Sequence, residues 1–152
     1  MDRISWLGCS ESAPDAVLLK NEPLYAEQRQ VMRRHPEMGA AIIGEHAPTL
    51  LQMARRVALT HHEKWDGIGY PQGLQGGDIA LEGRIVTIAD VFDALTNERP
   101  YKAAWPVERA IELLRNESGR HFDPALVQLF IKLLPEVLKV KEKWPESSVH
   151  AI

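Results

Sequence analysis

Apolar residues recur at helical spacing on both sides of one long segment, residues 63–82, in which glycine and proline interrupt regular structure. That segment, with Gly83 at its end, contains six of the ten glycines of the chain and also Pro71. Loops of this length in a compact domain are usually functional or disordered. The pattern therefore predicts an all-α domain with one long internal loop.

Prolines mark where most of the predicted helices begin, because proline suits the first turn of a helix and disfavours helical backbone at the residue before it. The predicted helices cover about residues 26–34, 37–44 and 84–95, and further helices open at 48, 106 and 124. Asp123 is predicted to cap the last of these, and Gly119 to stop the one before it. A fraying helical extension is expected after Pro135.

Length and composition limit the class of protein. The 152 residues predict one domain. A net charge of −3 argues against binding a nucleic-acid polymer, although a small anion in a locally basic pocket remains compatible with it. Cys9 is the single cysteine, which excludes an internal disulfide and fits a reducing compartment. The sequence has no apolar run long enough for a membrane span and no signal-peptide pattern, so we expect a cytoplasmic protein.

Two adjacent histidines, His61 and His62, continue the apolar stripe of their helix, because each follows an apolar residue by four positions. Neighbouring side chains on a helix point about 100° apart, so the pair can serve two neighbouring metal ions. Neutral imidazole is a common ligand of transition metals. The alternative is one core histidine satisfied by hydrogen bonds and one exposed histidine, and the pair alone does not decide.

A carboxylate at Asp90 stands in a helix that is apolar nearly all round. Burying it costs several kcal/mol unless it is paired, hydrogen-bonded or bound to metal. A salt bridge with an arginine is the alternative.

His35, at the junction of two predicted helices, taken alone suits a structural role better than a metal site. As a set, three imidazoles and a carboxylate suit zinc, iron or manganese.

The loop after His62 offers a possible substrate wall around Tyr70, whose ring can stack on a nucleobase or merely anchor the loop. Glu63 falls on the polar side of its helix and is predicted to be structural. Arg99 and Lys102 can hold a phosphodiester, with a solvated charge pair as the alternative. The flexible backbone and fixed turn of the loop come from Asp66, Gly67, Gly69 and Pro71.

Residues 61–74 read HHEKWDGIGYPQGL, and shorter motifs stand before and after them at residues 14–20, 35–39, 83–95, 99–102 and 119–124. In order and spacing these motifs resemble the HD-GYP domain, a branch of the HD metal-dependent phosphohydrolases. The resemblance covers about residues 14–135. The combination of one long motif with several ordered satellites is far more specific than any of them alone.

The resemblance implies a helical bundle that binds a divalent transition metal, iron or manganese, and hydrolyses cyclic di-GMP to the linear dinucleotide or GMP. By position it makes metal ligands of His35, His61, His62 and Asp90. It places Tyr70 against the substrate, and Arg99 and Lys102 near the phosphates. The family loop is also associated with contacts to diguanylate cyclase domains, which makes such a domain an expected partner.

One family element, a His-Asp doublet, does not occur in these 152 residues. Residues 6–10, which include Cys9, stand in its place. We therefore expect a non-matching segment 1–13, an HD-GYP-like domain 14–135 that lacks the first helices of the bundle, and a charged extension 136–152. The missing helices would leave apolar surface for a partner or a homodimer. Two functions follow: a cyclic di-GMP phosphodiesterase, and an inactive module that binds a partner protein or senses cyclic di-GMP.

Overall fold

The computed structural model describes residues 30–46, 48–98 and 103–143. These residues form α3 (His35–Ile43), α4 (Thr49–Thr60), the short 3₁₀ helix η2 (Gly76–Asp78), α5 (Leu81–Thr96), α6 (Val107–Asn116), α7 (Pro124–Lys132) and α8 (Leu134–Lys143). Within this part of the chain, β-type pairing is limited to one isolated bridge between Ser118 and Phe122. The predicted all-α class is confirmed.

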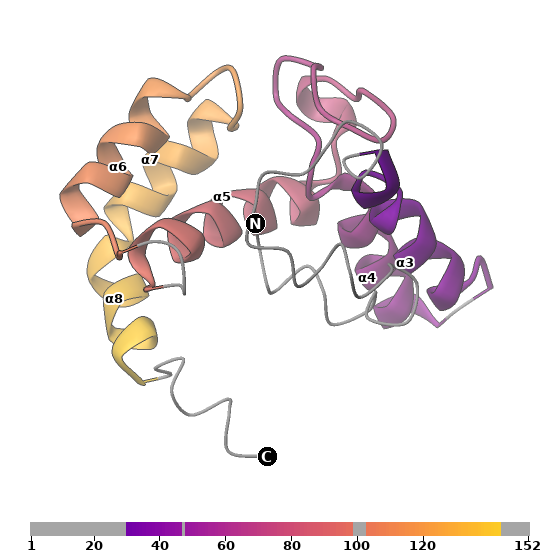
Figure 1. Ribbon diagram of the computed structural model, residues 1–152, viewed down its shortest axis with the longest axis horizontal. Coiled ribbons are helices and arrows are strands. Elements are labelled where there is room, and N and C mark those ends of the chain that lie inside the picture. The colour runs from indigo at the N-terminus through magenta and orange to yellow at the C-terminus, as the bar shows by residue number, and fades with distance from the viewer. Residues whose placement is uncertain (1–29, 47, 99–102, 144–152) are drawn as a thin grey trace.

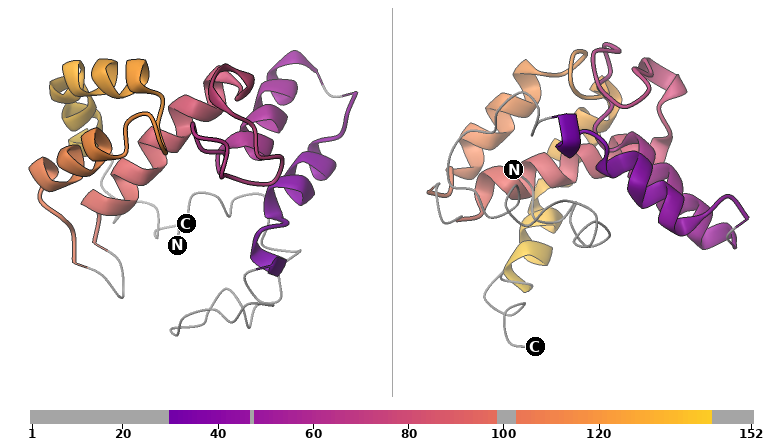
Figure 2. Two further views of the ribbon diagram at one scale, coloured as in Figure 1. Left: turned by 90° about the horizontal axis from the view of Figure 1, so that it is seen from above. Right: turned by 45° about the vertical axis from the view of Figure 1, so that its right-hand side comes forward.

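The helices form two groups that share α5 (Figure 1). α3 packs on α4, and α4 packs on the N-terminal part of α5, while α6 and α7 pack on α5 towards its other end and α8 packs on α7. Seen from above, the two groups stand on either side of α5 (Figure 2). This single helix of 16 residues therefore fixes how the two groups are placed relative to each other.

The hydrophobic core lies between α5, α6 and α7. Ile88 and Phe92 supply its α5 side and Leu114 the α6 side, while Phe122 enters from the turn that precedes α7. The ring of Phe92 meets that of Phe130 edge-on, with centroids 5.1 Å apart, which adds a specific contact to the burial of apolar surface. This core anchors the C-terminal half of α5.

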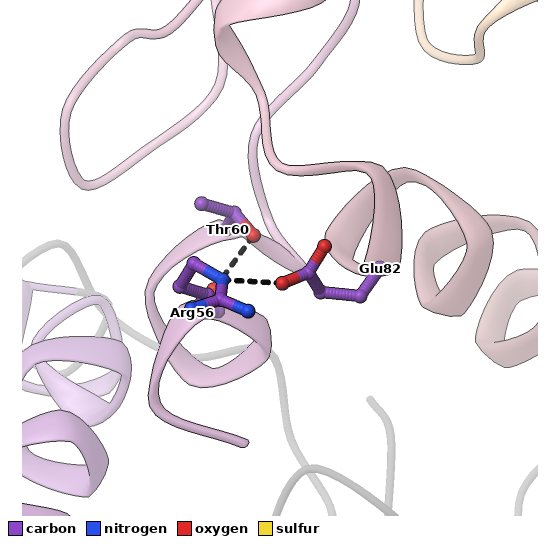
Figure 3. A network of polar contacts seen from close by, with 3 residues as sticks. All are labelled: Arg56, Thr60 and Glu82. Atoms are coloured by element: carbon purple, nitrogen blue, oxygen red, sulfur yellow. Dashed lines mark hydrogen bonds and ion pairs between the residues drawn. The ribbon is translucent and has the colours of Figure 1, made fainter. Parts of the chain in front are cut away.

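The N-terminal half of α5 is anchored differently, by a close crossing with α4. Gly83 lies so near Thr60 that a Cβ built on it would stand 2.0 Å from the hydroxyl oxygen of Thr60. That hydroxyl donates to the carbonyl of Arg56, and the Arg56 guanidinium pairs with Glu82 at the start of α5 (Figure 3). A partly exposed ion pair contributes little to stability. The crossing therefore depends mainly on the absence of a side chain at Gly83.

Two predicted helix starts are wrong by a few residues. The helix expected from 84 begins at Leu81, because Gly83 serves the crossing with α4 from inside the helix instead of ending the loop. The helix expected from 37 begins at His35, with Pro36 in its first turn. The predicted N-cap is confirmed, since the Asp123 carboxylate accepts from the backbone N–H of Ala125 at 2.9 Å.

Gly119 was predicted to stop its helix, and α6 ends before it, at Asn116. It lies in the turn that follows, with φ of +82°, and its N–H donates to the carbonyl of Phe122 at 2.8 Å. The predicted extension after Pro135 is part of α8. The part of the chain that the structure describes has no helix long and apolar enough to cross a membrane.

The close crossing predicts that Gly83→Ala destabilises the chain, because the new methyl group collides with Thr60 and forces α4 and α5 apart. We expect a loss of about 1 to 3 kcal/mol in the free energy of unfolding, measured by urea denaturation. The matched control is Gly77→Ala, where a Cβ would meet nothing within 4 Å. Equal stability of the two variants would contradict the packing role of Gly83.

Candidate metal centre

Three histidines from two helix ends converge on one point. His35 is the first residue of α3, His61 follows the last residue of α4, and His62 comes next. One ring nitrogen of each lies within 4.8 Å of the others. The Nε2 atom of His35 is 3.1 Å from Nε2 of His61 and 3.1 Å from Nε2 of His62. The structure thus brings together three of the four residues predicted to bind metal.

Backbone carbonyls set the orientation of two of these rings. His35 Nδ1–H donates to the carbonyl of Met32 at 2.6 Å, and His61 Nδ1–H donates to the carbonyls of Val57 and Ala58 at 3.0 and 2.9 Å. A neutral imidazole with its proton on Nδ1 carries a lone pair on Nε2. In their neutral forms the two Nε2 atoms that face each other are therefore both acceptors, and their approach is favourable when a metal ion or an added proton lies between them.

The separation of these nitrogens suits a metal ion. Adjacent ligands of one ion stand about 3 Å apart when the metal–nitrogen bonds are about 2.1 Å long. A hydrogen bond from the second ring nitrogen to a carbonyl is the usual means of orienting a histidine ligand. The donor set of nitrogen atoms suits zinc, iron or manganese more than magnesium or calcium. The residues present thus fit a transition metal.

The environment of His62 keeps its imidazole neutral. Burial, followed by the charges that His61 and His35 carry when protonated, lowers the pKa of His62 from its ordinary value of 6.5 to about 3. The ring of Tyr70 stacks on it, with centroids 4.8 Å apart and an angle of 22° between the planes. A neutral imidazole is the form that binds a metal ion.

Asp90, the fourth predicted ligand, is half-buried on α5 and is not a member of the three-histidine group. It follows Thr87 by three residues, on the same side of the helix. The hydroxyl of Thr87 lies 3.0 Å from the carbonyl oxygen of His61. This contact places the Thr87 side of α5 against the histidines, and the role of Asp90 as a ligand stays a prediction.

The loop between α4 and α5 is held by a buried carboxylate. Glu63 is only 2% exposed, and its two oxygens accept from the backbone N–H groups of Gln72 at 2.7 Å and Leu74 at 3.0 Å. The predicted structural role of Glu63 fits these contacts, but not its assignment to a polar helix face, because α4 ends at Thr60 and the loop folds over this residue. Loop closure, which helical periodicity does not describe, accounts for its burial.

Close packing of the loop explains two of the predicted signature residues. A Cβ at Gly69 would stand 2.4 Å from the backbone nitrogen of Lys64 and 2.5 Å from Cα of Glu63, so only glycine fits there. Gly67 has a φ of +83°, a conformation that favours glycine. Asp66 accepts from the N–H of Ile68 at 3.1 Å, and Pro71 follows Tyr70 through a cis peptide bond.

The loop is also tied to the turn between α6 and α7. The N–H groups of Trp65 and Asp66 donate to the carbonyls of His121 and Arg120, at 3.1 and 2.8 Å. Burial and the charge of Lys64 lower the pKa of His121, whose ring stacks on Phe122. His121 is therefore part of the support of the loop, and the loop is connected to both groups of helices.

Arg33 is a residue at the site that was not predicted from the sequence. Its guanidinium carbon lies 5.2 Å from the ring centroid of Tyr70. The signal that could have drawn attention to it is its place two residues before His35. Arg99 and Lys102, the predicted phosphate-binding residues, lie outside the described residues, as do the segment 1–13 and Cys9.

A family model and several known proteins match this chain. A family model described as HD domain matches residues 7–126. The 3'3'-cGAMP-specific phosphodiesterase 2 of Vibrio cholerae is 44% identical over 133 residues, which cover 88% of this chain and 26% of that protein. A cyclic di-GMP phosphodiesterase of the same organism is 46% identical over 142 residues, which cover 90% of this chain and 27% of that protein.

A solved structure shares the fold. The crystal structure of a cyclic GMP-AMP specific phosphodiesterase of V. cholerae superposes with a TM-score of 0.57 at 20% sequence identity, covering 84% of this chain and 33% of that chain. The chain therefore spans about a quarter of the length of the two curated relatives and a third of the solved one.

The neutral state of His62 predicts how the stability of the metal-free chain depends on pH. The unfolded chain gains a proton at this residue near pH 6.5, whereas the folded chain does so only near pH 3. Stability therefore falls as the pH drops below 6.5, by up to about 1.4 kcal/mol per pH unit from this one group. Urea unfolding in a chelator at several pH values measures the slope, which should be shallower by up to one proton in His62→Gln. An unchanged slope would show that His62 is not held neutral.

The buried carboxylate predicts that Glu63→Gln loosens the loop, because the new amide places an NH₂ group opposite a backbone N–H. We expect a loss of about 1 to 3 kcal/mol in the free energy of unfolding, together with faster proteolytic cleavage within residues 66–77. The control is Glu82→Gln, which removes a charge from a partly exposed ion pair. Similar cleavage in both variants would exclude the proposed anchoring.

Proposed function

The chain belongs to the HD domain family and carries the HD-GYP motif, and we propose on this basis that it takes part in the hydrolysis of a cyclic dinucleotide. The observation that carries the proposal is the convergence of three Nε2 atoms beside an aromatic ring, with two of the three imidazole rings oriented by backbone carbonyls. The relatives are named as phosphodiesterases for cyclic di-GMP or 3'3'-cGAMP. Because the chain spans only part of those proteins, activity and substrate remain proposals for it.

HD domains are metal-dependent, and the histidine cluster is a site that can hold a metal ion. We propose iron or manganese as the metal, with His35, His61, His62 and Asp90 as ligands from this chain. A bound divalent ion would polarise the phosphodiester and lower the pKa of a bound water.

The residues of this chain have separate tasks in the proposed site. The carbonyls of Met32, Val57 and Ala58 hold the imidazoles of His35 and His61 in the orientation needed for binding metal. Tyr70, stacked on His62, shields one side of the site from water and offers a face to a nucleobase. Arg99 and Lys102 are proposed to contact the phosphates of the substrate.

An alternative is a module without turnover that senses cyclic di-GMP or binds a partner such as a diguanylate cyclase domain. The observation that favours it is that these 152 residues contain no His-Asp doublet. Ile68, which is 70% exposed on the loop, is an apolar side chain available to such a partner. Ile42 on α3 and Leu50 on α4 are also exposed apolar side chains, and they are available for a homodimer.

Metal binding and turnover separate the two functions. We expect the purified chain to bind Mn²⁺ or Fe²⁺ and His61→Ala to lower the metal affinity at least tenfold, because one ligand is lost. His46→Ala is the matched control, since His46 is exposed and lies outside the cluster. Release of linear dinucleotide from cyclic di-GMP, measured by chromatography, supports the enzyme.

Binding of cyclic di-GMP or of a diguanylate cyclase domain without product supports the inactive module. A chain that binds neither metal, nor cyclic di-GMP, nor a diguanylate cyclase domain contradicts both functions. Equal metal affinities of the His61→Ala and His46→Ala variants would remove His61 from the ligand set.

A further inference from the structure

Arg33 stands next to the three histidines without belonging to their cluster. It lies two residues before His35, and its side chain is exposed. Its guanidinium carbon is 5.2 Å from the centroid of Tyr70, and the Tyr70 ring is in turn stacked on His62 at 4.8 Å. The guanidinium is thus one aromatic ring removed from the imidazoles.

Three arginines of α4 and α5 are engaged with carboxylates. Arg55 pairs with Glu45, Arg56 with Glu82 and Arg84 with Asp123. No carboxylate in residues 30–46, 48–98 and 103–143 forms an ion pair with Arg33. Its positive charge is therefore not neutralised by the described part of the protein.

A positive charge beside a cation site has an electrostatic cost. It repels the metal ion that the histidines are proposed to bind, and the repulsion is larger where the surroundings are partly desolvated. An anion that contacts both the metal and the arginine reverses the sign of this effect. The placement of Arg33 thus disfavours the metal alone and favours the metal together with an anionic ligand.

The contact between Arg33 and Tyr70 is a cation–π contact at 5.2 Å, which leaves the guanidinium able to bind such an anion. A guanidinium over an aromatic ring keeps its N–H groups in its own plane, where they can bind a phosphate oxygen pair side by side. A cyclic dinucleotide carries two phosphodiesters. If one phosphodiester is bound at the histidines, the second phosphodiester can contact a residue outside the histidine cluster.

We infer that Arg33 is a substrate-binding residue that contacts the phosphodiester of a cyclic dinucleotide that is not bound at the histidines. The inference rests on the proposed function, because it requires a nucleotide at the three-histidine cluster. Arg33 would then discriminate between substrates, because it would strengthen the binding of those with two phosphodiesters and not of those with one.

The test compares Arg33→Gln with Arg34→Gln, the adjacent exposed arginine. We expect Arg33→Gln to weaken the binding of cyclic di-GMP about tenfold or more, measured as Kd, or as KM if the nucleotide turns over. The affinity for Mn²⁺ alone, measured by calorimetry, should stay the same or rise. Binding of bis(p-nitrophenyl) phosphate, which has one phosphodiester, should not change. Arg34→Gln should resemble the wild type in all three, and Arg33→Lys should retain part of the nucleotide affinity.

Each other outcome overturns the inference in a recognisable way. If wild type and Arg33→Gln bind cyclic di-GMP equally, Arg33 has no role in binding, and the proposed function stands. If Arg33→Gln loses affinity for Mn²⁺ as well as for the nucleotide, the residue only supports Tyr70 and His62. If the wild type with metal binds no cyclic dinucleotide, the proposed function fails and the inference fails with it.

Discussion

The arrangement of this site depends on a carboxylate that touches no part of the proposed chemistry. Glu63 is buried directly after the histidine pair and accepts hydrogen bonds from two backbone N–H groups nine and eleven residues further on. Each bond closes the loop back onto the residue that follows His62. A buried carboxylate left without such donors would be strongly unfavourable. The loop and the carboxylate therefore stabilise each other, and Tyr70 reaches His62 as a result of that closure.

Main-chain groups set most of the geometry around the histidines. Carbonyls orient two of the rings, the N–H of Tyr70 donates to the carbonyl of His62 at 3.2 Å, and Thr87 contacts the carbonyl of His61. Main-chain groups are free to make such contacts at helix ends, where they lack partners within the helix. This accounts for the position of the cluster at the first residue of α3 and just past the last residue of α4.

Much of the fold and part of the site could be predicted from the sequence. Helical spacing and proline positions predict the helices to within a few residues, and the histidines are identified by the family motif, whose assignment to HD domains is confirmed. Gly83 shows one limit of sequence-based prediction, since the sequence does not distinguish a glycine that permits close helix packing from a glycine that ends a loop. Glu63 and Arg33 show another limit. Their environments arise from loop closure and from a cation–π contact between distant segments, neither of which has a sequence period.

The shared helix α5 has a consequence for variation in this protein. Phe92 lies two residues after Asp90, and Ile88 two residues before it, and both are packed in the core with α6 and α7. The rotation of α5 about its own axis is thus determined by apolar packing, and Asp90 and Thr87 turn with it. A change of side-chain volume in the core, far from any polar group, would re-aim these residues. Selection on the polar face of α5 therefore also constrains the shapes of the apolar side chains behind it.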